Sequence, residues 1–131
     1  MSKVALVTGA GTGIGRAAAL AMLKDGYRVA LVGRRKELLE KTAAGSDSAM
    51  VLPGDITRPE VVKEMFRQVK DKWGRLDVLF NNAGMGAPAV PMDELPYEKW
   101  KEVVDINLNA MFLCSMEAVR IMKAQQPKGG R

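Results

Sequence analysis

The sequence predicts an α/β fold in which helices cover both faces of a parallel sheet. Three observations lead to this prediction. Short apolar runs alternate with stretches of helical periodicity, and a turn rich in glycine follows the first run. The chain has 131 residues with a hydrophobic content of 47%, which suffices for one domain with a sizeable core.

Each element follows from its local pattern. The apolar run at residues 3–8 predicts a buried strand, and residues 27–32, 49–52 and 76–80 predict three more. Helical spacing predicts helices over residues 14–25, 37–44 and 58–73. The apolar positions expected on the first of these helices are Ile14, Ala17, Ala18, Ala21 and Met22. Strands separated by helices form βαβ units, so we expect a doubly wound parallel sheet in three α/β/α layers.

The last third of the chain predicts a loop rich in Gly and Pro at residues 84–96, followed by a long helical region at 97–125. One side of that region is expected to carry Trp100, Val104, Leu108, Met111, Val119 and Met122. Residues 127–131 are a helix stop and turn that should lead into another strand. Ending there would expose the apolar strand at 76–80 as a sheet edge. We therefore expect a fragment of a longer polypeptide, with a small protein that has a frayed tail as the alternative.

The composition excludes several function classes. The sequence contains no histidine, which removes Ser-His-Asp and Cys-His catalysis and histidine ligands for zinc. Its one cysteine, Cys114, excludes an internal disulfide and a CxxC pair, so we expect no metal site and a reducing, cytoplasmic setting. No apolar run approaches the roughly 20 residues that span a bilayer, so we expect no membrane partner. The charge of +5 is scattered and aromatic residues make up 5%, which argues against nucleic-acid binding.

The glycine-rich turn lies between the first strand and the first helix. It reads Thr8-Gly9-Ala10-Gly11-Thr12-Gly13-Ile14-Gly15. Glycines allow a tight turn and let backbone N–H groups approach a phosphate, to which the helix N-terminus adds positive potential. The spacing is neither GxxxxGK[ST] nor GxGxxG, but TGxxxGxG. Taken alone, the turn could also serve only to pack the helix on the strand.

With this spacing the chain resembles the short-chain dehydrogenase/reductase family, whose members are Rossmann-fold enzymes that use NAD(H) or NADP(H). Three further matches follow in the family's order. They are Asp55 in Gly54-Asp55-Ile56-Thr57, the motif Asn81-Asn82-Ala83-Gly84, and Asn107 in Val104-Asp105-Ile106-Asn107-Leu108. The resemblance implies cofactor contacts at Gly9, Gly11, Thr12, Gly13, Ile14, Gly15, Asp55, Ile56, Asn82, Ala83 and Gly84. It also implies that Asn107 is the asparagine of the family's catalytic tetrad.

Each of these matches has a plainer interpretation on its own. Asp55 can begin the turn before Pro59, and Asn82 to Gly84 can be an ordinary turn. Asn107 shares a helical stripe with Trp100, so we expect it to be buried with its amide satisfied. Four matches in order, from residue 8 to residue 107, are what favour the family.

The end of the second strand bears on the choice of cofactor. In dinucleotide folds, an acidic residue there binds the ribose hydroxyls of NAD, whereas an arginine accommodates the 2′-phosphate of NADP. Here Gly33 stands at the acidic position and Arg34 follows, which favours NADP(H) over NAD(H). Two points oppose this. Arg34 can be a solvated residue that opens the next helix, and Thr12 stands where many NADP-type relatives carry Lys or Arg.

The resemblance also implies the chemistry, a hydride transfer between the nicotinamide and a small carbonyl or alcohol substrate. The family's serine and YxxxK motif lie after the tetrad asparagine, beyond the next strand. Tyr97 and Lys101 match YxxxK by letters but precede Asn107, so we interpret them as the solvent-facing start of a helix. Residues 1–131 would then be the NAD(P)-binding half of an oxidoreductase of class EC 1.1.1.-, inactive alone. The alternatives are a non-catalytic nucleotide-binding or regulatory module and a binder of another nucleotide.

Further partners are also implied by the resemblance. The missing C-terminal half of the polypeptide would complete the enzyme, and family members usually form dimers or tetramers. Met111, Met116 and Met122 would be partly buried in such an interface, although packing within the monomer explains them equally well. Residues 84–96 would form one wall of the substrate site. That segment carries no charge before Asp93, which suggests an uncharged region near the nicotinamide.

Overall fold

Four parallel strands form one sheet in the order β3-β2-β1-β4 in the computed structural model, which describes residues 2–131. The strands are β1 (Val4–Thr8), β2 (Arg28–Gly33), β3 (Ala49–Pro53) and β4 (Val78–Phe80). All three neighbouring pairs are parallel, with Leu6 of β1 opposite Ala30 of β2 and Leu79 of β4. The chain thus starts in the middle of the sheet, runs outward to β3 and then crosses to β4, which is the expected doubly wound topology.

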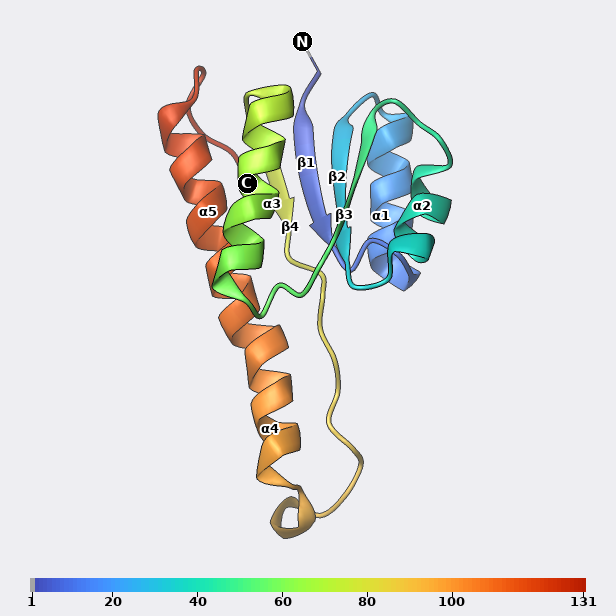
Figure 1. The fold of residues 1–131 in the computed structure, drawn as a ribbon, viewed down its shortest axis with the longest axis vertical. Coiled ribbons are helices and arrows are strands. Elements are labelled where there is room, and N and C mark those ends of the chain that lie inside the picture. The colour runs from blue at the N-terminus through green and yellow to red at the C-terminus, as the bar shows by residue number, and fades with distance from the viewer. Residues whose placement is uncertain (1) are drawn as a thin grey trace.

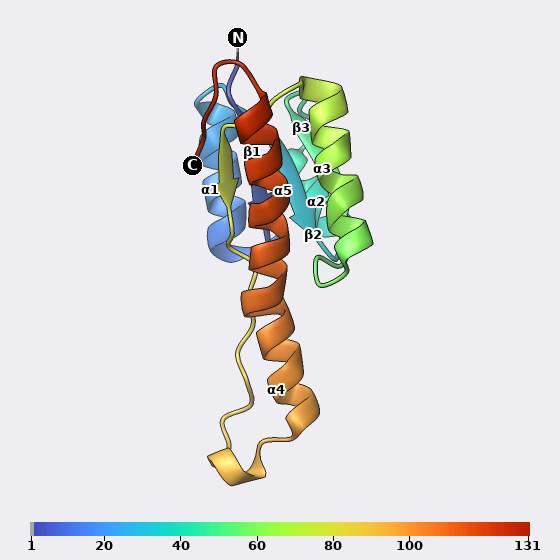
Figure 2. The ribbon, with the colours of Figure 1, turned by 90° about the vertical axis from the view of Figure 1, so that its left-hand side faces the viewer.

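Helices cover both faces of this sheet (Figures 1 and 2). They are α1 (Gly13–Lys24), α2 (Lys36–Ala43), α3 (Pro59–Trp73), α4 (Tyr97–Val104) and α5 (Ala110–Ala124). A 3-10 turn, Met92–Glu94, precedes α4, and a π-helical turn, Asp105–Asn109, joins α4 to α5. Helices α1 and α2 lie on one face, and α3 and α5 lie on the other. The three-layer Rossmann-type fold predicted from the sequence is confirmed.

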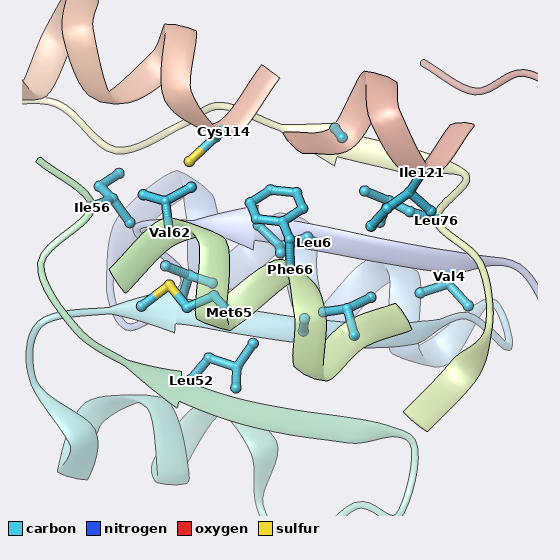
Figure 3. Packing of buried hydrophobic residues seen from close by; sticks show 14 of the residues in the cluster. Val4, Leu6, Leu52, Ile56, Val62, Met65, Phe66, Leu76, Cys114 and Ile121 are labelled. Carbon is cyan, nitrogen blue, oxygen red and sulfur yellow. The ribbon is translucent and has the colours of Figure 1, made fainter. Parts of the chain in front are cut away.

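The core lies on both sides of β1, whose five residues are all buried. Val4 and Leu6 point into the larger cluster under α3 and α5, while Ala5 and Val7 point into the smaller one under α1 and α2. Figure 3 shows the larger cluster, in which Phe66 of α3 packs between the sheet and α5. This two-sided burial explains why β1 is a continuous apolar run.

Helix α1 presents a different side to the sheet from the one that its apolar spacing predicts. Ile14 is 73% exposed, whereas Gly15 and Ala19 are buried. The cause is the close packing of Gly15 against the turn that follows β1, which turns the Gly15–Ala19 side inward. Of the other apolar positions at helical spacing, Ala17 and Ala21 are exposed, while Ala18 and Met22 are half-buried.

The long helical region also differs from its prediction. Residues 97–124 are helical throughout, but the buried positions of α5 are Ala110, Cys114, Ala118 and Ile121. Trp100, Leu108, Met111 and Val119, predicted to share the apolar side, are exposed. Two causes combine: the π turn breaks the 3.6-residue period between α4 and α5, and α4 projects beyond the sheet with no buried residue of its own (Figure 1).

Strand β4 starts two residues later than predicted, and a side chain binds the backbone of Leu76 just before it. The buried amide of Gln125 accepts a hydrogen bond from the backbone N–H of Leu76 and donates one to its carbonyl, both at 2.8 Å. The same amide nitrogen donates to the Gly129 carbonyl at 2.8 Å. Gln125 therefore ties the end of α5 and the following turn to the start of β4.

The turn after α5 brings the chain back alongside β4. The Arg131 N–H donates to the Asp77 carbonyl at 2.9 Å, and the Leu79 N–H donates to the Arg131 carbonyl at 2.7 Å. This is the hydrogen-bond pattern of a parallel pair. Residues 127–131 thus lie where the sequence predicts the approach to another strand.

Asp77 also accepts bonds from the Arg75 guanidinium and from the Val4 N–H, which lower the pKa of its carboxyl group.

We predict that Gln125→Ala destabilises the fold by about 2–4 kcal/mol, because it leaves the buried N–H and C=O of Leu76 without partners. Urea unfolding followed by circular dichroism measures the change. The matched control is Gln126→Ala, which removes an exposed side chain at the next position. Equal losses of stability in the two variants would contradict the assigned role of Gln125.

Candidate cofactor site

A cavity of about 520 Å³ opens at the carboxyl ends of the four strands. This is where open α/β sheets bind ligands, and the volume lies in the range of small-molecule sites. The cavity brings together eight of the predicted site residues: Gly9, Gly11, Thr12, Arg34, Asp55, Ile56, Ala83 and Gly84. The other predicted residues, Gly13, Ile14, Gly15, Asn82 and Asn107, lie beside it in the same loops and helices without lining it.

The turn between β1 and α1 depends on glycines, two for their backbone conformation and one for close packing. Gly9 and Gly13 have φ values of 68° and 54°, in the left-handed region. A Cβ at Gly15 would overlap the carbonyl oxygen of Gly9 and lie 2.5 Å from Asn82 Nδ2. The N-terminus of α1 is therefore drawn close to the strand end, where its free N–H groups can bind an anion.

Thr8, the last residue of β1, holds the turn against the end of β4. Its buried hydroxyl accepts hydrogen bonds from the N–H groups of Asn82 and Ala83 at 3.0 and 2.9 Å. The Asn82 amide in turn donates to the carbonyls of Thr8 and Gly9 at 3.2 and 3.4 Å. The sequence motifs do not assign this role to Thr8. The one feature of the sequence that could have indicated this role is that Thr8 is the only polar residue of an otherwise apolar strand.

The end of β2 supplies the basic side of the cavity. Gly33, Arg34 and Arg35 all line it. Gly33 packs under α2, since a Cβ there would lie 3.1 Å from Leu39 Cδ2. Arg34 lies close enough to Asp55 for its charge to affect that carboxyl group.

Asp55, after β3, is held as a carboxylate. Its Oδ1 accepts a hydrogen bond from the Thr57 hydroxyl at 2.7 Å and another from the Thr57 N–H at 3.0 Å. These bonds are the main cause of the lowered pKa of Asp55, and the positive charges of Arg34 and Arg58 lower it further. The carboxylate can thus accept hydrogen bonds from a ligand without first losing a proton.

Asn107 lies in the π turn and is exposed, which corrects the expectation that it is buried. Its amide is satisfied nonetheless. The Met85 N–H donates to Asn107 Oδ1 and Asn107 Nδ2 donates to the Met85 carbonyl, both at 2.8 Å. Asn107 is exposed because the π turn lies where the helix leaves the sheet, so its partner is the loop after β4. This two-bond clamp fixes the backbone of Met85 at the rim of the cavity.

Tyr97 and Lys101 do not line the cavity. They begin α4, and Lys101 Nζ lies 5.7 Å from the centre of the Tyr97 ring. Both are exposed. Their arrangement agrees with the interpretation of this YxxxK as the start of a helix.

Metal ligands and membrane-spanning helices are both absent from the described part of the chain. Within residues 2–131, no cluster of three or more His, Cys, Asp or Glu side chains could hold a metal ion. No helix in this range is long and apolar enough to cross a bilayer.

Comparisons with known proteins identify the family. The model of the short chain dehydrogenase family matches residues 3–131. A 3beta-hydroxysteroid dehydrogenase of Mediterraneibacter gnavus is 39% identical over 132 residues, covering 98% of this chain and 47% of that protein. An uncharacterized oxidoreductase of Staphylococcus aureus is 34% identical over 94% of this chain and 54% of its own length.

Solved structures of proteins from the same family are also similar to this chain. An NAD+-bound xylitol dehydrogenase superposes with a TM-score of 0.90 at 34% identity, covering 97% of this chain and 50% of that one. A 3-ketoacyl-(acyl-carrier-protein) reductase from Brucella melitensis, complexed with NADH, has a TM-score of 0.89 at 31% identity, covering 92% of this chain and 50% of that one. The chain therefore belongs to the short-chain dehydrogenase family of oxidoreductases. It spans about half the length of the first curated relatives that it matches.

We predict that Thr8→Val destabilises the protein by about 1–3 kcal/mol, because the half-buried N–H of Ala83 loses its partner. Chemical unfolding measures the loss. Thr8→Ser keeps the hydroxyl and should retain most of the stability. A Thr8→Val protein as stable as the wild type would show that the hydroxyl does not hold the junction.

We also predict that Thr57→Val raises the pKa of Asp55 toward its ordinary value, because it removes the hydroxyl that most favours the carboxylate. The stability that Asp55 contributes is fully present above the ordinary pKa of an aspartate and is lost as the pH falls through its lowered pKa. Carboxyl-carbon NMR titration reads the shift directly. Thr57→Ser is the control, and a pKa that is unchanged in Thr57→Val would refute this account.

Proposed function

We propose that this chain is the NAD(P)-binding part of an oxidoreductase that transfers a hydride between the nicotinamide and a carbonyl or alcohol substrate. The observation that carries this proposal is the cavity along the strand ends. It joins the glycine turn, the Arg34 and Asp55 side chains, and the Ala83–Gly84 backbone into one continuous surface. Such a surface suits an elongated ligand with a phosphate-bearing middle.

The residues fit the parts of a dinucleotide. The glycine turn and the N-terminus of α1 would hold the pyrophosphate, while Asp55 and Ile56 would lie beside the adenine. Ile14 is exposed next to this turn and would be covered by the bound cofactor. Ala83 and Gly84, at the end of β4, would lie toward the nicotinamide. When bound, the cofactor would accept a hydride from an alcohol carbon, or donate one to a carbonyl carbon, while the oxygen loses or gains a proton.

We favour NADP(H) over NAD(H). Arg34 and Arg35 both line the cavity at the end of β2, where Gly33 offers no carboxylate to repel a 2′-phosphate. Asp55 opposes this preference, because its negative charge lies near Arg34. The guanidinium groups outnumber that carboxylate at this end of the cavity.

Asn107 is the one tetrad residue that we assign in this chain. Through its clamp on Met85 it would position the loop that passes the nicotinamide. The tyrosine, lysine and serine that would move the proton are expected in a C-terminal half of the polypeptide, so residues 1–131 alone should bind cofactor without turnover. A non-catalytic nucleotide-binding module is the second candidate. It would show cofactor binding in a natural-length protein that never turns over any alcohol or ketone.

We further propose that a second copy of the protein covers the outer side of α5. Phe112 and Val119 are exposed there, Leu108 is exposed in the π turn just before it, and Met116 lines a shallow groove with Phe112. Exposed apolar surface of this kind is typical of an interface. We expect a homodimer or homotetramer in the cytoplasm.

We predict that the chain binds NADPH more tightly than NADH, and that Arg34→Ala weakens NADPH binding by about 10- to 100-fold with little effect on NADH. The reason is the removal of a charge-assisted hydrogen bond to the 2′-phosphate, worth about 1.5–3 kcal/mol. Isothermal titration calorimetry measures both affinities. Arg28→Ala is the control, since Arg28 is exposed at the opposite end of β2.

Two results would contradict two different claims. NADPH binding that is unchanged in Arg34→Ala, with weaker NADH binding, would refute the preference for NADP(H). If neither nucleotide binds to the wild-type protein, the proposed function itself is wrong.

A further inference from the structure

We propose that the substrate is a largely apolar ketone or secondary alcohol without negative charge, and that Met85 forms a fixed part of the wall that selects it. This inference rests on the proposed function, because it concerns the nicotinamide end of the same cavity. That end is bounded by residues 84–109, a segment that we call the arm. The arm leaves the end of β4, projects past the carboxyl ends of the strands and returns through α4 (Figures 1 and 2).

The order of the strands locates the reacting end of the cavity. Asp55 follows β3 and Arg34 follows β2, whereas the segment that begins with Ala83 follows β4, on the other side of β1. If the adenosine lies over β2 and β3, the other end of a dinucleotide points toward β4 and the arm. Ala83, Gly84, Met85 and Ile106 line this end of the cavity. None of the four carries a charge, and the charged residues that line the same end, Glu102 and Asp105, are both acidic.

Met85 is an ordered part of that wall. Both of its backbone polar groups bind the Asn107 amide at 2.8 Å, which ties the Met85 backbone to the π turn. Its side chain remains 44% exposed at the cavity. An exposed thioether on a fixed backbone offers an apolar surface that adapts to a ligand's shape.

The arm continues this apolar character outward. Residues 78–92 contain no charged side chain, and Val90 and Met92 are exposed, Met92 by 93%. Neither residue lines the cavity, but both continue the apolar surface that begins at Met85, and exposed apolar surface of this kind is typically covered by another apolar group. The C-terminal half that we expect would cover the outer part of the arm, and an apolar substrate would lie against its cavity end at Met85.

Charge on the arm argues against an anionic substrate. Residues 84–109 carry five acidic and two basic side chains, a net charge of −3, although the whole chain carries +5. Both lysines are paired within α4, Lys99 with Glu102 at 3.4 Å and Lys101 with Glu98 at 4.0 Å. Glu102 and Asp105 line the cavity rim. A carboxylate, a phosphoester or an acyl group on an acidic carrier would be repelled there.

The test compares 4-ethylcyclohexanone with 4-oxocyclohexanecarboxylate, two ketones of nearly equal shape that differ in charge. It is run on the natural-length polypeptide that contains this chain, with NADPH and with NADH. The ketone gains a hydride at carbon from the reduced cofactor and a proton at oxygen. We expect kcat/KM to be at least about tenfold higher for the neutral ketone, and the ratio to narrow as salt screens the acidic rim.

Two variants test the wall itself. Met85→Ala keeps the backbone clamp and should lower kcat/KM for the neutral ketone by about 5- to 10-fold, because the shorter side chain covers less of the apolar substrate. Leu20→Ala is the matched control, because Leu20 is similarly exposed, by 39%, on the outer side of α1, away from the cavity. It should leave kcat/KM unchanged.

The inference is overturned if the anionic ketone is reduced as well as the neutral one. It is equally overturned if Met85→Ala behaves like Leu20→Ala, or if cofactor binds and neither ketone is reduced. Calorimetric titration with the cofactor keeps these results apart from a failure of the proposed function, which would appear as an absence of nucleotide binding.

Discussion

The close approach of Gly15 to the carbonyl of Gly9 is the constraint on which the rest of the structure depends. It draws the N-terminus of α1 onto the end of β1, leaving no room for a side chain between them. Asn82 completes the junction, because its amide donates to the backbone of Thr8 and Gly9. One small volume therefore joins the first strand and the first helix to the end of the last strand, which is far from both in sequence.

This junction also positions the loop that follows β4. The Thr8 hydroxyl fixes the backbone at Asn82 and Ala83, and the Asn107 amide fixes Met85 two residues further on. The loop is thus held at both sides of Gly84, once by β1 and once by the π turn. The β4 end of the cavity is consequently tied both to β1 and to the π turn, although α4 itself has no buried residue.

The alternation of strands and helices, the strand order and the glycine turn can be predicted from the sequence, because each depends on local pattern and spacing. The side of α1 that faces the sheet cannot be predicted in this way, because it depends on the close packing of Gly15 on Gly9 rather than on the spacing of apolar residues. The buried side of α5 cannot be predicted either, because the spacing of apolar residues does not reveal the π turn from Asp105 to Asn109. The link between Gln125 and the backbone before β4 cannot be predicted either, because the two are 49 residues apart in sequence.

The candidate site shows the same division. Its backbone elements follow from motifs, and Arg34 and Asp55 follow from their places after β2 and β3. The roles of Thr8 and of Met85 arise from hydrogen bonds to residues 74 and 22 positions away. No pattern within a single element contains that information.

The buried thiol has a consequence for how motions of this fold can be observed. Cys114 lies on the sheet-facing side of α5, and burial raises its pKa to about 12 (Figure 3). A thiol in that state is both shielded and protonated at neutral pH, so it cannot react while the helix stays in place. The rate at which a thiol reagent modifies Cys114 would therefore depend on how often α5 separates from the core. Measuring that rate would report local unfolding of α5 without an introduced probe.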